Sequence, residues 1–183
     1  MLKSYWVPLI SGKKELSKEN FREGWDKRGF TNKPRGGLFT SLWHPEWGPE
    51  WGLFWVFHYC SPEARDLELP VWEVDLRGWK VERAGKERPD FEAFKGGKWD
   101  ALLIDPASLE EEWESLPTAE KWWLGWDVRT VWIPKWPEER VRFLGKLGEV
   151  APREAVERYL KVAQRFGSIL DEDSNTRRWE AVF

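Results

Sequence analysis

The chain has 183 residues, of which 41% are hydrophobic and 33% are charged, a balance that suits one packed domain and excludes global disorder. The formal net charge of −3 argues against a protein built to coat nucleic acid, because such proteins are usually basic. No apolar run approaches the roughly 18 residues of a membrane span, and the opening residues lack a signal-peptide pattern, so we expect a cytoplasmic protein with no membrane partner.

Hydrophobic patterning and turn residues predict the elements of the first half of the chain in order. These are a strand over 4–10, a short helix over 16–26 with Ser17 as its N-cap, a strand over 38–43, and a helix over 49–59. A buried strand over 53–60 fits the last segment nearly as well, and this alternative stays open.

The second half alternates strands and helices. We predict strands over 70–76, 79–83, 99–104 and 126–133, and helices over 90–95, 108–116, 137–147 and 152–166. The tight turn at Arg77 and Gly78 predicts that the first two of these strands form a hairpin.

The order of elements predicts an α+β fold in one domain, with a mixed, split β-sheet and a C-terminal helical pair. We expect residues 1–134 to form the α+β core. Residues 135–183 are then a helical extension packed on the same domain. No linker is long enough to divide the chain.

Cysteine and histidine are too scarce for a metal centre. The single Cys60 excludes an internal disulfide, and His44 and His58 provide too few further ligands for structural zinc. We therefore expect no metal. Abundant Glu, Lys and Arg with few amides indicate a thermophilic source.

The chain contains 16 tryptophans, far above ordinary usage, and they follow no fixed period. A tryptophan buries a large area and keeps one N–H that needs a partner. An aromatic core is the simplest interpretation, while sugar stacking, base stacking and a protein interface are the functional alternatives.

Two sequence features indicate possible chemistry. The turn at 32–37 combines cations with glycines, which let backbone N–H groups approach an anion, and the hydroxyls of Thr40 and Ser41 follow it. Asp100 and Asp127 each come directly after a tryptophan in a predicted strand, where a carboxylate is costly unless it is paired or functional. A pairing of Asp127 with Arg129, two residues along the same strand face, is the structural explanation.

Three segments in a fixed order resemble an uncharacterised family of phages and bacteria. They read K-P-R-G-G-L-F-T-S at 33–41, W-D-A-L at 99–102 and G-W-D-V-R-T-V-W at 125–132. That family is distantly similar to ADP-ribosyltransferases, which use NAD. The resemblance implies NAD contacts from a set of residues around the strand with the hydroxyls: Tyr5, Arg35, Gly36, Gly37, Thr40, Ser41 and Trp126.

The resemblance also places Asp127 and Arg129 at the catalytic position. In the enzymes a Glu stands where this chain has Arg129, and that Glu stabilises a cationic transition state. A cation does not stabilise a developing cation, so this difference counts against transferase activity. The Arg or His of the family's first strand is also replaced, and Tyr5 stands in that strand here.

Two hypotheses follow, and the sequence leaves open whether the protein is an enzyme. In the first, it is an ADP-ribosyltransferase-like NAD-binding protein, active through an acid such as Asp127. In the second, it is a non-enzymatic Trp-rich protein that binds a host or virion protein. An ion pair that occupies Arg129 favours the second.

Overall fold

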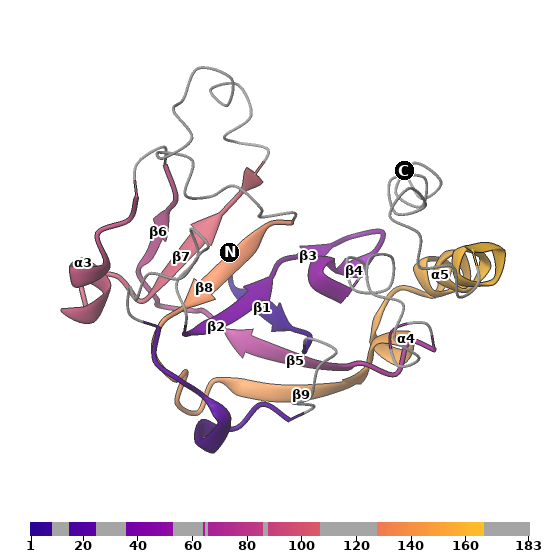
Figure 1. The fold of residues 1–183 in the computed structure, drawn as a ribbon, viewed down its shortest axis with the longest axis horizontal. Coiled ribbons are helices and arrows are strands. Elements are labelled where there is room, and N and C mark those ends of the chain that lie inside the picture. The colour runs from indigo at the N-terminus through magenta and orange to yellow at the C-terminus, as the bar shows by residue number, and fades with distance from the viewer. Residues whose placement is uncertain are drawn as a thin grey trace.

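The computed structural model describes residues 1–8, 15–24, 36–52, 64, 66–85, 88–106 and 128–166. Within these residues the chain forms a seven-stranded sheet and a separate two-stranded sheet (Figure 1). The strands of the large sheet are β1 (Lys3–Trp6), β2 (Leu38–Ser41), β5 (Pro70–Asp75), β6 (Val81–Arg83), β7 (Ala101–Ile104), β8 (Thr130–Ile133) and β9 (Val141–Lys146). The small sheet pairs β3 (Trp43–His44) with β4 (Gly48–Pro49).

The large sheet has the order β6-β7-β8-β2-β1-β5-β9 and is mixed, because β6 and β7 are parallel while the other neighbours are antiparallel. The described helices are a 3-10 turn η1 (Lys18–Asn20), α3 (Phe91–Lys95), α4 (Leu147–Val150) and α5 (Arg153–Phe166). Helices α4 and α5 form the C-terminal pair. The predicted α+β class with a mixed sheet is confirmed. No described helix has the length and hydropathy needed to cross a membrane.

The predicted hairpin is wrong in its pairing. The turn forms, with Gly78 at φ 77°, but the strand that follows does not return along β5. It pairs instead in parallel with β7, where Val81 lies opposite Ala101 at the far end of the sheet. β5 has β1 and β9 as its neighbours, and a short local pattern does not reveal such distant partners.

The predicted helix over 137–147 is also wrong, because residues 141–146 form strand β9. Pro137 does not start a helix but accepts the Arg140 N–H at 3.2 Å in a turn. β9 then pairs with β5 over five register positions, so its backbone groups are satisfied by the sheet. Part of the expected helical extension therefore belongs to the sheet.

Other boundaries changed less. The expected helix over 16–26 is reduced to the 3-10 turn η1, and Ser17 makes no side-chain cap bond there. Helical backbone begins at Glu50, directly after Pro49, and the rest of that segment lies outside the described residues. The predicted helix over 108–116 also lies outside them. Asp90 caps α3 by accepting the Glu92 N–H at 3.1 Å.

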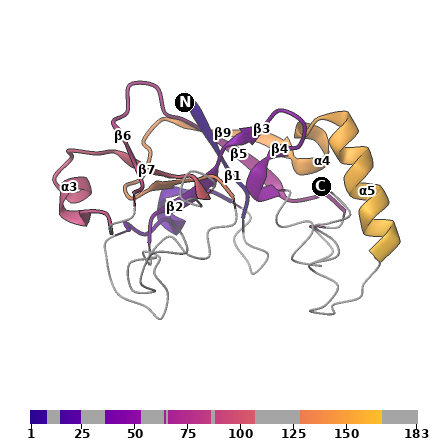
Figure 2. The same cartoon turned by 90° about the horizontal axis from the view of Figure 1, so that it is seen from above.

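Two hydrophobic clusters hold the sheet. Trp132, fully buried, is central to the first, where Phe91 and Phe94 of α3 contact its ring edge-on at 5.5 and 5.6 Å between centroids. The same cluster reaches Tyr159 of α5, so α3 and the C-terminal pair cover opposite ends of the sheet (Figures 1 and 2). The second cluster is built from buried aliphatic side chains: Leu16, Leu38, Val74, Leu76, Ala101, Leu103, Val131 and Ile133.

The described tryptophans serve mainly the core. Trp47, Trp51 and Trp132 are buried, and none of the described tryptophans is among the exposed large hydrophobic residues. For this part of the chain, the aromatic-core interpretation of the composition is the one that fits. The exposed large hydrophobic residues are instead Met1, Leu2, Phe143 and Leu160.

Candidate functional site

Thr40 lies in the middle of β2, opposite Val131 of β8. Its side chain is fully buried, and its hydroxyl donates a hydrogen bond to the Val131 carbonyl at 2.8 Å. The neighbouring residues in the strand, by alternation, face the other side of the sheet. The Thr40 hydroxyl is thus a structural group within the packed sheet.

Ser41 follows Thr40 and therefore points to the opposite face. Its side chain is also fully buried, and its Oγ accepts the backbone N–H of Trp51 at 2.9 Å. The two hydroxyls that the sequence placed side by side are separated by the sheet itself. They do not converge on one cofactor.

Arg129, which comes just before β8, is held by Glu50. Its Nε donates to Glu50 Oε1 at 2.8 Å, and its terminal NH2 nitrogen lies 2.7 Å from the same oxygen. The backbone N–H of Arg129 donates to Glu50 Oε2 at 3.1 Å. One carboxylate therefore receives both the side chain and the main chain of Arg129.

Burial and charge act in opposite directions at this pair. Burial raises the pKa of Glu50, and the hydrogen bonds from Arg129 oppose that shift. The hydrogen bond to Glu50 raises the pKa of Arg129, with a smaller contribution from the charge of Asp105. His44 lies close enough to Glu50 to lower its pKa through its charge. This end of the sheet is a charged cluster centred on Glu50 and Arg129.

Tyr5 and Ser41 are brought together, because they are register partners of β1 and β2. The Tyr5 ring packs on Trp43 with 5.1 Å between centroids. Burial raises the pKa of Tyr5, and the nearby charge of Glu73 adds to the shift. Tyr5 is thus the one described member of the predicted cofactor set with a half-buried aromatic face.

The two glycines of the predicted anion-binding turn have packing roles. The Gly36 carbonyl accepts the Trp132 indole N–H at 2.9 Å, and the Gly37 N–H donates to the Arg22 carbonyl at 2.7 Å. Gly37 has φ 84°, and a Cβ added there would lie 2.3 Å from Trp132 Nε1. A side chain at Gly36 would meet the Glu23 carbonyl at 2.3 Å. Close backbone approach explains both glycines.

Three of the predicted site residues, Arg35, Trp126 and Asp127, lie outside the described residues. The expected pairing of Asp127 with Arg129 is therefore not seen, and the observed partner of Arg129 is Glu50. Asp100, the other carboxylate after a tryptophan, accepts the Lys80 N–H at 2.8 Å. Among the described residues, no three His, Cys, Asp or Glu side chains form a metal-binding group.

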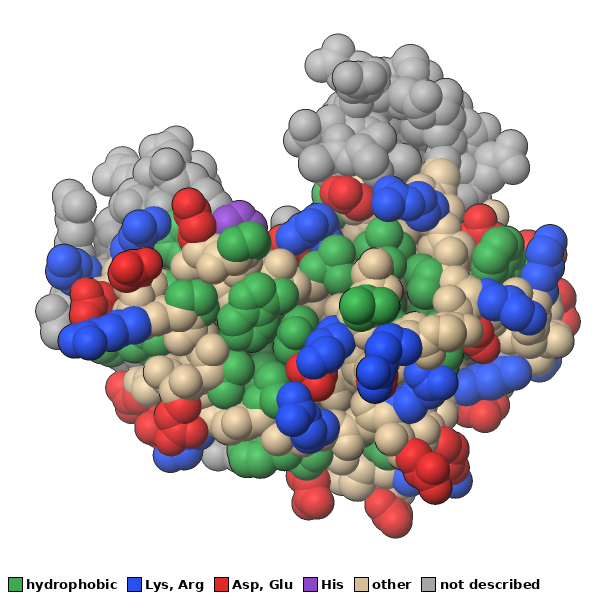
Figure 3. All heavy atoms as spheres, turned by 180° about the vertical axis from the view of Figure 1, so that it is seen from behind, with side chains coloured by type: hydrophobic (Ala, Val, Ile, Leu, Met, Phe, Trp, Pro, Cys, Tyr) green, Lys and Arg blue, Asp and Glu red, His purple; other side chains and the backbone are tan. Residues whose placement is uncertain are grey.

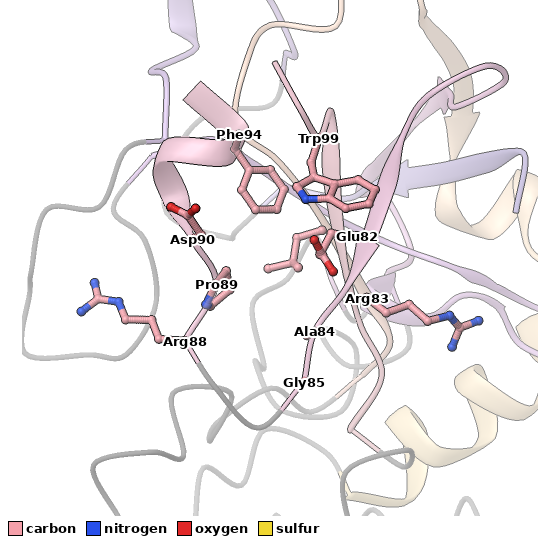
Figure 4. Close-up of a pocket in the computed structure, with 10 residues that line it drawn as sticks. Glu82, Arg83, Ala84, Gly85, Arg88, Pro89, Asp90, Phe94 and Trp99 are labelled. Atoms are coloured by element: carbon pink, nitrogen blue, oxygen red, sulfur yellow. The ribbon is translucent and has the colours of Figure 1, made fainter. Parts of the chain in front are cut away.

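A cavity that the sequence analysis missed lies between β6 and α3 (Figure 4). Its volume is about 470 Å³, and its walls come from β6, the segment after it, α3 and the start of β7. The ring of Trp99 and the carboxylate of Glu82 point into it beside Phe94 (Figure 4). The sequence signal that could have indicated it was Glu82, an acid within the predicted strand over 79–83. In the structure Glu82 pairs with buried Leu102 and shares its face of the sheet.

Glu50 was missed as well. It stands in the aromatic segment 47–55, where a carboxylate needs a partner, just as Asp100 and Asp127 do.

In comparisons with protein-family models, curated proteins and solved structures, nothing matched this chain, so the resemblance to ADP-ribosyltransferases stays a prediction.

Proposed function

We propose that this protein is a non-enzymatic binding module whose partner is another protein. The observation that carries the proposal is the pairing of Arg129 with Glu50. The residue that the resemblance places at the transferase Glu is a cation, and its guanidinium makes two contacts with a carboxylate that also accepts its backbone N–H. It has the wrong charge for stabilising an oxocarbenium-like state and serves as a structural partner instead.

The two hydroxyls support the same proposal. Thr40 and Ser41 are fully buried, on opposite faces, and each is bound to a backbone group. Recruiting either hydroxyl to a ligand would break a buried hydrogen bond, which costs about 1–3 kcal/mol. A nicotinamide pocket built on them would therefore have to break these buried hydrogen bonds.

The surface supports a protein rather than a nucleic acid as the partner. Hydrophobic side chains occupy the middle of one face, with Lys and Arg side chains gathered beside them (Figure 3). Leu2, just before β1, and Phe143, in β9, are 63% and 52% exposed, and β5 lies between these two strands in the sheet. Exposed apolar groups with arginine are typical of protein interfaces, whereas the net charge of −3 disfavours a polyanion.

The experiment is a nicotinamide-release assay with NAD. It uses the wild type and the double variant Glu50→Arg with Arg129→Glu, which places a Glu at the transferase position and keeps an opposite-charge pair. We expect neither protein to release nicotinamide above the rate in buffer. Release by the wild type would overturn the proposal, and release by the double variant alone would identify a transferase disabled at Arg129.

A further inference from the structure

We propose that the cavity between β6 and α3 binds the guanidinium group of an arginine side chain presented by the partner protein. The inference rests on the proposed binding function and names what the partner must offer. The cavity of about 470 Å³ is in the size range of ligand sites and has room for a guanidinium group with its aliphatic stem.

Glu82 is the first reason. Its β6 position is paired with that of Leu102, which is 1% exposed, so the half-buried carboxylate stands beside an apolar floor. Among the described residues, Glu82 has neither a hydrogen bond nor an ion pair. A carboxylate that faces a cavity without a partner in the protein is available to a ligand. A cationic ligand supplies that partner.

The aromatic wall is the second reason. Phe94 and Trp99 point into the same space as the Glu82 carboxylate (Figure 4). The faces of aromatic rings attract cations, and the Trp99 ring already has Lys98 Nζ 5.7 Å from its centroid. Phe94 is 1% exposed, so the accessible ring is that of Trp99, and this ring and the Glu82 carboxylate favour the same charge on a ligand.

The cations at the cavity mouth do not neutralise Glu82. Arg83, the next residue of the strand, belongs to the opposite side of the sheet by alternation, and Figure 4 shows its side chain directed away from the cavity. Arg88 also points away, and its guanidinium lies 5.4 Å from the Phe91 ring centroid. Of these three charged side chains, only that of Glu82 points into the cavity (Figure 4).

The shape of the group favours arginine over lysine. A guanidinium is planar, stacks on an indole and donates two parallel hydrogen bonds to one carboxylate. Trp99, in the segment just before β7, and Glu82, in β6, offer these two features. An anionic ligand would instead face the carboxylates of Glu82 and Asp90.

The test titrates the full chain with blocked arginine (Nα-acetyl-L-arginine N-methylamide), following the indole N–H signal of Trp99 by NMR. Blocked lysine and blocked citrulline serve as probes of charge and shape. We expect saturable binding of arginine, with citrulline weaker by about tenfold because it lacks the charge. Glu82→Gln should weaken arginine by a similar factor without changing Tm, since Glu82 has no partner in the protein.

Glu92→Gln is the matched control, because Glu92 is exposed on α3 outside the cavity lining. It should leave arginine binding unchanged. Equal affinity for arginine and citrulline, or full binding by Glu82→Gln, would overturn the inference. Tighter binding of GMP or glucose than of arginine at Trp99 would also overturn it, in favour of a nucleotide or sugar site. Nicotinamide release with arginine binding intact would overturn only the proposed function.

Discussion

Arg129 donates from its side chain to one carboxylate oxygen of Glu50 at 2.8 Å and from its backbone to the other at 3.1 Å. The two residues are 79 positions apart, so this contact ties the start of β8 to the segment after β4. The contact also gives Arg129 a structural role, because its side chain and backbone are both bound to Glu50.

Removing the cation should destabilise the protein. The Glu50 side chain is 13% exposed and that of Arg129 is 37% exposed, so Arg129→Ala leaves a mostly buried carboxylate without its partner. We expect a loss of about 2 kcal/mol in the free energy of unfolding, less than for a fully buried pair because solvent reaches Arg129. Urea denaturation measures it.

The charge reversals give the control for this pair. Arg129→Glu should cost more than Arg129→Ala, because it places two carboxylates together. Adding Glu50→Arg should recover part of that loss. If the double variant is as unstable as Arg129→Glu alone, the interaction is not the ion pair described here.

Two buried serines provide a matched pair of substitutions. Both Ser4 and Ser41 are fully buried, but Ser41 accepts the Trp51 N–H, whereas Ser4 Oγ meets no partner among the described residues. Ser41→Ala should cost about 1–3 kcal/mol, since it leaves a buried N–H unsatisfied. Ser4→Ala should be neutral or stabilising. Equal losses in thermal or urea unfolding would contradict the assigned role of Ser41.

Alanine substitutions at Gly37 and Gly78 distinguish the cost of a steric contact from the cost of backbone strain. Both have positive φ, 84° and 77°, but a Cβ at Gly37 meets Trp132 at 2.3 Å, while one at Gly78 meets nothing within 4 Å. Gly78→Ala should cost about 1 kcal/mol from the backbone alone. Gly37→Ala should cost clearly more, and in the folded variant it should shift the Trp132 indole N–H signal in NMR spectra. Similar losses for the two variants would contradict the packing role of Gly37.

Asp75 allows a prediction of how the free energy of unfolding changes at acid pH. The hydrogen bonds from Arg77 lower the pKa of Asp75 from 3.8 to about 2. Because the folded-state pKa lies below the unfolded one, this stabilisation is present above about pH 4 and is lost as the pH falls towards 2. An NMR titration should give a carboxyl midpoint near the lowered value, and Arg77→Leu should return it towards the ordinary one. An unchanged midpoint in that variant would assign the shift to another cause.

The elements that the sequence predicted well are those with strong local signals. The alternation over 70–76, the apolar run over 99–104 and the short helix over 90–95 appear in the structure as β5, β7 and α3. The partner of β6 and the strand nature of β9 were missed, because both depend on pairing with segments far along the chain.

The site was predicted less well for a related reason. Thr40 and Ser41 were correctly placed in a strand, but strand alternation separates their hydroxyls. The structure shows Glu50 as a partner of Arg129, which the sequence analysis did not identify, while the predicted partner Asp127 lies outside the described residues. Glu82 was not predicted as a site residue, because the cavity that it lines also needs Phe94 and Trp99, which come from other parts of the chain.

Calorimetric titration of the wild-type protein with NAD tests the central claim most directly. Because Thr40, Ser41 and Arg129 are all bound within the protein, we expect no saturable heat at millimolar NAD and no rise in Tm by mass action. A saturable heat with a matching rise in Tm, reproduced by ADP-ribose, would contradict the non-enzymatic binding function and return the protein to the NAD-dependent class.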